Sequence, residues 1–120
     1  MTCLTVSLAL RLTVGVGVVS GYSMWPALAP GDMVVYVRHL PPAEGSVVVA
    51  ELPGHGLIIK RVAGAAPGAV LLLGDNRDHS YDSRQFGPLR QEYIVGRVVL
   101  IWPRRPRPPE ERPGIPSQPR

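Results

Sequence analysis

The chain has 120 residues, of which 45% are hydrophobic, and carries a formal net charge of +4. This length is sufficient for one small domain with a single hydrophobic core and too short for two. Five arginines and two glutamates lie in residues 103–120, so most of the excess positive charge belongs to the end of the chain and does not indicate a nucleic-acid-binding domain. The lone cysteine, Cys3, excludes an internal disulfide.

The chain begins with an apolar segment that runs through LTVSLALRLTVGVGVV, residues 4–19. It is shorter than the roughly 20 residues of a membrane-spanning helix, and Arg11 interrupts it. It also lacks the charged leading region and the cleavage site of a complete signal peptide. We therefore expect residues 1–11 to form a truncated or peripheral anchor rather than a full transmembrane helix.

Five runs rich in Val, Ile and Leu, bounded by Pro, Gly, Asp or Asn, predict β-strands. They lie at residues 33–39, 46–52, 56–63, 69–75 and 93–101. A sixth strand is possible at residues 12–19, although alternating glycines weaken its pattern. No window before residue 103 shows a capped amphipathic helix. The sequence therefore predicts a mostly β fold over residues 12–103, a small antiparallel β-barrel or sandwich domain.

Two connections carry more polar residues than a turn requires. One is GYSMWPALAPGD, residues 21–32, and the other is GDNRDHSYDSRQFGP, residues 74–88. Fifteen residues without a strand pattern make a long loop for a compact domain, and such loops are usually functional or disordered. After the last strand, residues 104–120 are rich in Pro and Arg, which predicts a disordered tail.

The chain contains twelve arginines and a single lysine, Lys60, which lies inside an apolar predicted strand. Arginine does not lose its proton in proteins, whereas a lysine removed from water does so readily. Lys60 is therefore a candidate base, although a strand lysine whose ammonium group reaches solvent is the simpler interpretation. The hydroxyl of Ser23 is a candidate nucleophile, which needs a base because a hydroxyl is weakly nucleophilic at neutral pH.

Histidine is the alternative base for such a serine. His39 lies near a strand end, His55 lies in the turn PGHG, and His79 lies inside the long polar loop. None of the three belongs to a recognisable pattern with an aspartate and a nucleophile. A histidine triad remains an unsupported alternative, and a Ser–Lys pair is a known variant of the same chemistry.

Four segments, in this order, resemble the sequence motifs of type I signal peptidases. They are SMWPAL with the following PGD, then KRV, then GDNRDHSYDSRQFGP, and finally GRVVLIWP. The similarity covers residues 20–103, nearly the whole predicted domain. It implies a β-rich serine protease with a Ser–Lys dyad that removes signal peptides from preproteins. It also implies a location at the cell membrane, with the catalytic domain on the extracytoplasmic side.

The resemblance implies that Ser23 is the nucleophile and Lys60 the general base, with Met24 and Pro26 shaping the turn that presents the hydroxyl. It also implies supporting roles in the long polar loop. Ser80 matches the serine that hydrogen-bonds the lysine, and Asp82 with Arg84 matches an ion pair near the site. The remaining matched residues form the turn that returns this loop over the strands: Gly74, Asp75 and Asn76.

The chain departs from some family members at Gly21. Those members have a serine two positions before the nucleophile, and its hydroxyl contributes to the oxyanion hole. Other members have glycine, so Gly21 is compatible with activity but supplies no side-chain donor. We expect the backbone N–H of Ser23 to be one oxyanion donor, and we do not assign the second to Ser20.

The expected partners are a preprotein or precursor peptide and a membrane surface. We expect no nucleic acid, no cofactor and no metal, because the histidines and the cysteine lack ligand spacing and no glycine pattern cradles phosphate. Three alternatives remain. The first is a soluble, cytoplasmic protease that matures one precursor, as in nickel superoxide dismutase processing. The second is a self-cleaving repressor domain, and the third is a non-enzymatic module that binds membranes or nucleic acids.

Overall fold

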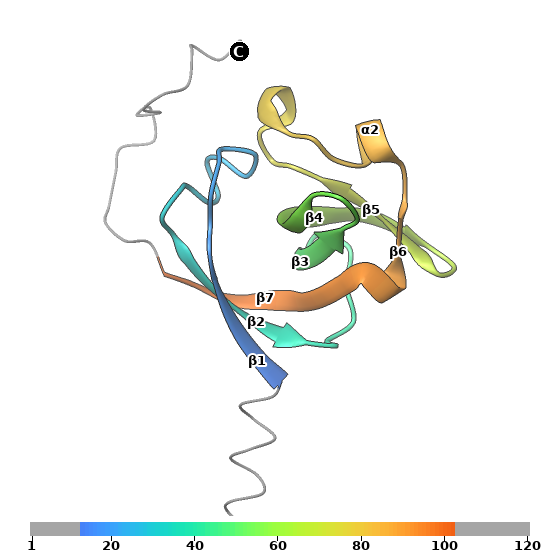
Figure 1. Ribbon diagram of the computed structural model, residues 1–120, viewed down its shortest axis with the longest axis horizontal. Helices are drawn as coiled ribbons and strands as arrows, with labels where there is room; N and C mark the ends of the chain where they lie inside the picture. The colour runs from blue at the N-terminus through green and yellow to red at the C-terminus, as the bar shows by residue number, and fades with distance from the viewer. Residues whose placement is uncertain (1–12, 103–120) are drawn as a thin grey trace, which may run out of the picture.

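The computed structural model describes residues 13–102, so the predicted N-terminal segment (residues 1–11) and tail (residues 104–120) lie outside the described residues. The described part is one antiparallel sheet in the order β1-β2-β7-β3-β4-β5-β6 (Figure 1). Its strands are β1 (Val14–Val18), β2 (Met33–Arg38), β3 (Val47–Leu52), β4 (Gly56–Ala66), β5 (Ala69–Leu73), β6 (Leu89–Arg90) and β7 (Ile94–Trp102).

The mostly β, antiparallel fold predicted from the sequence is confirmed, and each predicted strand is present within a few residues. Since β1 and β6 are the two ends of the strand order, the sheet does not close into a barrel. Between β1 and the end of β7, three short helices accompany it: η1 (Arg77–His79), α2 (Ser83–Phe86) and η2 (Gln91–Tyr93). Within residues 13–102, no helix has the length and apolar character needed to cross a bilayer.

The sequence predicted no capped amphipathic helix before residue 103, and the four-residue helix α2 is capped but has no buried face. Asp82 accepts a hydrogen bond from the backbone N–H of Arg84, and the side chain of Gln85 accepts one from the backbone of Asp82. This reciprocal arrangement is a capping box, which stabilises the first turn of a helix. The helix has four residues, so it was too short to produce the periodic apolar pattern on which the expectation depended.

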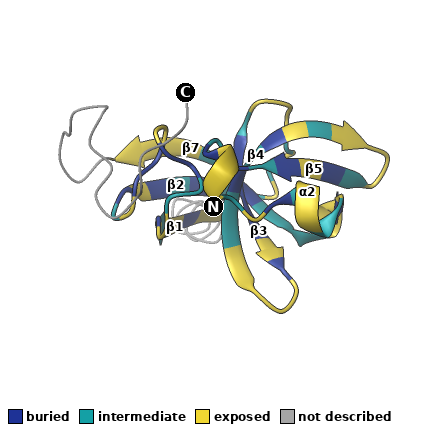
Figure 2. Ribbon diagram, turned by 90° about the horizontal axis from the view of Figure 1, so that it is seen from above, coloured by how far each residue is buried: buried dark blue, intermediate teal, exposed yellow. Residues whose placement is uncertain are grey.

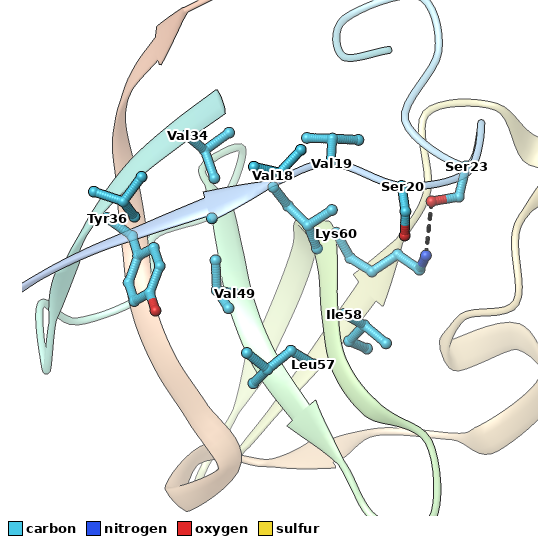
Figure 3. A pocket seen from close by; sticks show the side chains of 13 residues that line it. Val18, Val19, Ser20, Ser23, Val34, Tyr36, Val49, Leu57, Ile58 and Lys60 are labelled. Carbon is cyan, nitrogen blue, oxygen red and sulfur yellow. Dashed lines mark hydrogen bonds between the residues drawn. The ribbon is translucent and has the colours of Figure 1, made fainter. Parts of the chain in front are cut away.

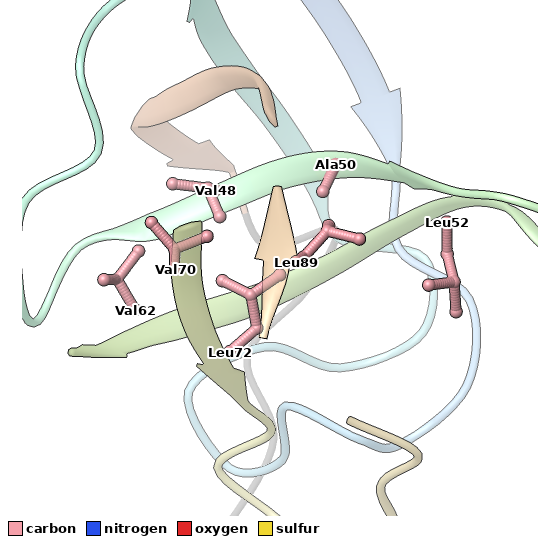
Figure 4. Close-up of a cluster of buried hydrophobic side chains, with 7 residues drawn as sticks. All are labelled: Val48, Ala50, Leu52, Val62, Val70, Leu72 and Leu89. Atoms are coloured by element: carbon pink, nitrogen blue, oxygen red, sulfur yellow. The ribbon is translucent and has the colours of Figure 1, made fainter. Parts of the chain in front are cut away.

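Strand β3 lies at the centre of the molecule, and residues 47–50 are all buried (Figure 2). Successive side chains of a strand point to opposite faces, so β3 contributes to two clusters. One side packs in the larger core cluster shown in Figure 4, which comprises Val48, Ala50, Leu52, Val62, Val70, Leu72 and Leu89. The other cluster joins β3 to the segment after β1 and comprises Val19, Met24, Leu28, Val34 and Val47.

The sheet is bent by irregularities in strand pairing. The register shifts between Val35 and Tyr36 in β2, between Val49 and Ala50 in β3, and between Val62 and Gly64 in β4. Such bulges bend a strand and increase its twist. As a result, the end of β1 and the first half of β4 line the same pocket, although they lie far apart in the strand order.

Candidate active site

Ser23 lies in the turn that follows β1, which we call the Ser23 turn (residues 21–32). Backbone and side-chain hydrogen bonds close this turn. The N–H of Val19 donates to the carbonyl of Asp32 at 2.8 Å, and the N–H of Ala29 donates to the buried carboxylate of Asp32 at 2.9 Å. The side chain of Met24 is 1% exposed in the second core cluster. The buried side chain of Met24 thus anchors the turn and holds the Ser23 hydroxyl in a fixed position.

Lys60 extends from β4 toward this turn (Figure 3). It lies between Ile58 and Val62 on one face of the strand, and both of these residues pack in or against the larger core cluster. The side chain is buried, with 6% of the residue exposed, and its Nζ donates a hydrogen bond to Oγ of Ser23 at 2.9 Å. The structure therefore brings together the two residues that the sequence proposed as base and nucleophile.

The pKa of Lys60 is lowered from its ordinary value. Burial is the main cause, because removal from water disfavours the charged ammonium, and the negative charge of Asp82 opposes it in part. A lowered pKa increases the fraction of neutral amine at a given pH. Only the neutral amine accepts a proton, so the environment of Lys60 favours a role as a base.

Asp82 organises the long polar loop beside the lysine. It is fully buried and accepts hydrogen bonds from Gly74 N–H at 2.9 Å, from the hydroxyl of Ser80 at 2.8 Å and from the guanidinium of Arg84 at 2.9 and 3.0 Å. Burial alone would raise the pKa of Asp82, but these hydrogen bonds outweigh it and hold the pKa well below its usual range. The carboxylate is therefore a permanent negative charge near Lys60.

Ser80 lies in this network rather than on the lysine. Its hydroxyl donates to Asp82, while the hydrogen bond of the Lys60 ammonium goes to Ser23. Ser80 also approaches Gly74 closely, since a Cβ placed on Gly74 would lie 2.5 Å from Cβ of Ser80 and 2.6 Å from the carbonyl oxygen of Ser23. Only glycine fits at position 74, because the Ser23 turn and the long polar loop contact each other there and leave no room for a side chain.

The residues after Gly74 hold the Ser23 turn from the other side. The backbone N–H of Asn76 donates to the carbonyl of Ser23 at 2.8 Å, and its side-chain amide donates to the carbonyl of Tyr22 at 3.1 Å. Asn76 is 6% exposed, so solvent does not compete with these bonds. Gly74 and Asn76 therefore fix the backbone on both sides of the Ser23 hydroxyl.

Arg61 is a contributor that the sequence analysis did not identify. Its Nε and Nη2 donate to the two carboxylate oxygens of Asp75 at 2.9 and 2.8 Å, and its Nη1 donates to the carbonyl of Gly45 at 2.8 Å. Bidentate pairs of this kind have high geometric specificity. Arg61 thereby ties β4 to the start of the long loop directly beside Lys60. The KRV segment was the available signal, but its arginine was interpreted only as part of a strand.

Gly21 adopts a backbone φ of +77°, which lies in the left-handed region, and a Cβ there would meet no atom within 4 Å. A serine at position 21 would have space but would adopt a strained backbone.

Pro26 is exposed and follows a cis peptide bond. Among residues 13–102, no acceptor receives a hydrogen bond from the backbone N–H of Ser23.

The three histidines do not approach the serine. His39, His55 and His79 are exposed, and no hydrogen bond joins any of them to Ser23 in the described part of the chain. The ring of His55 instead lies 5.4 Å from that of Tyr81. The geometry gives no support to a histidine triad.

A pocket of about 320 Å³ opens beside the serine and the lysine (Figure 3). One wall is formed by residues 16–20, at the end of β1, and the opposite wall by residues 57–60 of β4. Val34, Tyr36 and Val49 line the space between these walls. Valine, leucine and isoleucine side chains supply much of the lining, and Ser20, Ser23 and Lys60 lie together at one end of the pocket.

A sequence model of the family described as "Signal peptidase, peptidase S26" matches residues 1–70 and 65–103 of the chain. The chain belongs to the signal peptidase family, peptidase S26. The matched residues include the Ser23 turn, Lys60 and the long polar loop. Family membership therefore covers every part of the site described above.

Several curated relatives agree with this assignment. The chain is 32% identical to signal peptidase I of Bacillus caldolyticus, over 62% of this chain and 50% of the relative. It is 36% identical to signal peptidase I of Streptococcus pneumoniae, over 63% and 37%, and 41% identical to mitochondrial inner membrane protease subunit 1 of Xenopus tropicalis, over 50% and 35%. The chain thus spans half or less of the length of these relatives.

Proposed function

We propose that the protein is a serine endopeptidase that removes N-terminal signal peptides from exported preproteins with a Ser23–Lys60 dyad, and that residues 12–103 form its peptidase domain. The observation that carries the proposal is the 2.9 Å hydrogen bond between the buried amine of Lys60 and the hydroxyl of Ser23. The lowered pKa of Lys60 and the membership of the chain in the signal peptidase family support the same chemistry.

The reaction begins with Lys60 in the neutral form. The proton of the Ser23 hydroxyl moves to Nζ of Lys60 as Oγ attacks the carbonyl carbon of the scissile peptide bond. The resulting oxyanion accepts a hydrogen bond from the backbone N–H of Ser23, a donor type whose loss typically costs about 10²- to 10³-fold in rate.

The second half of the reaction regenerates both residues. Lys60 gives its added proton to the leaving amine as the C–N bond breaks, which leaves an ester between the substrate acyl group and Ser23. Water then attacks the ester, and Lys60 accepts a proton from this water. The ester bond breaks, the proton returns to Oγ of Ser23, and the signal peptide leaves with a new carboxyl end.

An extended substrate fits the two strand edges beside the pocket. β1 is the end of the strand order and therefore pairs with β2 on one side only. The first half of β4 pairs with β3, whereas its pairing with β5 begins only at Arg61. Free backbone groups on such edges bind an added strand through main-chain hydrogen bonds. A peptide lying between them reaches Ser23 at the end of β1.

The decisive experiment is cleavage of a panel of preproteins in detergent by the wild type and four variants. Ser23→Ala and Lys60→Ala should abolish cleavage while circular dichroism shows an intact fold. Lys60→Arg should be equally inactive, because arginine retains the charge but cannot act as a base. Ser46→Ala, at a half-buried, hydrogen-bonded serine before β3, is the matched control and should retain full activity. Substantial cleavage by Lys60→Arg would disprove the dyad, and cleavage of one precursor alone would indicate a dedicated maturation protease.

A further inference from the structure

Ser20 supplies a third polar side chain at the end of the pocket that holds Ser23 and Lys60 (Figure 3). It is exposed, and its hydroxyl points into the pocket. Among residues 13–102, this hydroxyl forms no hydrogen bond. A serine hydroxyl has one donor and two acceptor positions, so all of them are available to a molecule that enters the pocket.

The Ser23 turn fixes the backbone next to Ser20. The N–H of Val19 donates to the carbonyl of Asp32 at 2.8 Å, and the carbonyl of Val19 accepts a hydrogen bond from the N–H of Gly31 at 2.9 Å. The side chain of Val19 is 5% exposed in the second core cluster. Ser20 therefore occupies a defined position relative to Ser23, although its own side chain faces solvent.

Lys60 loses its hydroxyl partner during the proposed reaction. In the free protein, its amine is hydrogen-bonded to Oγ of Ser23 at 2.9 Å. Once Ser23 carries the acyl group, its Oγ has no proton to give, and the attacking water becomes the proton donor for Lys60. Ordered waters in proteins typically make about three hydrogen bonds, so one bond to the amine does not orient this water. The water needs a further partner beside Lys60.

Two serine hydroxyls are candidates for this partner, and the contacts favour Ser20. The hydroxyl of Ser80 donates to Asp82 at 2.8 Å, and Ser80 does not line the pocket. Ser20 lines the pocket together with Lys60, and no direct hydrogen bond joins these two residues in the described part of the chain. Polar groups that face the same space without a direct bond are commonly bridged by water.

We propose that the hydroxyl of Ser20, together with the amine of Lys60, positions the water that hydrolyses the acyl-enzyme. The inference rests on the proposed proteolytic function and assigns a role in the second half of its reaction. The water oxygen bonds to the ester carbonyl carbon as one water proton passes to Nζ of Lys60. The C–O bond to Ser23 then breaks, this proton moves to Oγ of Ser23, and the peptide leaves as a carboxylic acid. Ser20 gains and loses no proton, because it only accepts a hydrogen bond from the other water proton.

The test uses a peptide ester that has a signal-peptide cleavage sequence and a fluorescent alcohol as leaving group. An ester acylates the serine readily, so hydrolysis of the acyl-enzyme limits turnover. Ser20→Ala should lower kcat about tenfold, the effect of one lost hydrogen bond. It should lower KM by the same factor and leave kcat/KM, which reports acylation, unchanged. Intact-protein mass spectrometry should show that the acyl-enzyme accumulates in this variant.

Two further variants serve as references. Ser20→Thr retains a hydroxyl and should retain most of the wild-type kcat, while Ser46→Ala should match the wild type in both constants. Circular dichroism verifies the fold of each variant.

The outcomes separate the role of Ser20 from the proteolytic function. A Ser20→Ala variant with wild-type kcat, or with kcat and kcat/KM lowered by the same factor, would overturn the role in hydrolysis. Turnover of the ester by the wild type would then leave the protease in place. If the wild type neither releases the alcohol nor forms an acyl-enzyme, the proteolytic function itself fails, and the inference fails with it.

Discussion

Two opposed electrostatic effects act on the pKa of Lys60. Burial in the β4 face lowers its pKa, and the permanent charge of Asp82 raises it in part. Arg84 neutralises much of that charge through its paired hydrogen bonds. Activity requires the neutral amine, so the rate should rise with pH through the lowered pKa of Lys60, below the ordinary lysine value.

Substitutions at Asp82 and at Arg84 should shift the pH range over which kcat/KM rises, and the two shifts should be in opposite directions. Asp82→Asn removes the influence that raises the pKa of Lys60, so the limb of the kcat/KM profile should shift to lower pH. Arg84→Gln leaves the carboxylate less compensated, so the limb should shift to higher pH. Asp78→Asn, an exposed acid of the same loop, is the control for a general charge effect. Profiles that move in the same direction for both variants would contradict this assignment.

The contact between the Ser23 turn and the long polar loop is the critical junction at the scale of elements. Gly74 lies where the two segments touch, and Asn76 bonds the backbone carbonyls of the turn. Neither segment is a strand or a long helix, so the precision of the site comes from their mutual support. Displacing one of them must displace the other.

Gly74→Ala should therefore lower kcat/KM by about 10²-fold, because a displacement of about 1 Å at a reacting group has an effect of this size. Its Cβ would overlap Ser80 and the carbonyl oxygen of Ser23, and relieving the second overlap displaces the backbone of Ser23 itself. Gly64→Ala on β4 is the matched control, since its Cβ would lie 3.7 Å from Leu71, an ordinary contact. Thermal unfolding followed by circular dichroism separates loss of activity from loss of fold. Equal activities of the two variants would show that the junction is not critical.

The strands were predictable because they depend on local pattern, and the pairing of Ser23 with Lys60 was predictable from the resemblance to type I signal peptidases. Valine-rich runs predict strands from the local sequence alone. The single lysine in an apolar run was a candidate base for the same reason. The roles of Arg61 and Asp32 were not predictable, since they depend on which backbone groups the fold brings near them. The hydrogen bond from the Ser80 hydroxyl to Asp82 was not predictable either, because it depends on the folded conformation of the long polar loop.

At the scale of the whole molecule, a row of exposed apolar side chains beside the pocket is the surface that we expect to contact a membrane. The strand register places Val18, Met33 and Trp102 side by side across β1, β2 and β7, and they are 64%, 41% and 66% exposed. Rows of exposed apolar residues on a soluble domain commonly mark an interaction surface. This row lies at the end of β1 that leads into the Ser23 turn, where it would hold the pocket close to a lipid surface.

Replacing Val18 and Trp102 together by serine should weaken binding to phospholipid vesicles by about tenfold, since two large apolar side chains no longer enter the interface. Cosedimentation with vesicles of phosphatidylcholine and phosphatidylglycerol measures the change. Leu71→Ser, at an exposed leucine on β5, is the control and should bind as the wild type does. Vesicle binding that is equal in all three proteins would place the membrane contact elsewhere.

The position of β7 between β2 and β3 makes this strand the connection between the two parts of the site. Ser23 is held beside β1 and β2, and Lys60 extends from β4, which pairs with β3. No direct pairing joins β2 to β3 in the described residues, because the last strand of the chain separates and connects them. The strands that carry Ser23 and Lys60 therefore belong to two parts of the sheet that only β7 joins. Correct placement of the Ser23 hydroxyl beside the Lys60 amine requires β7 to pair with both β2 and β3.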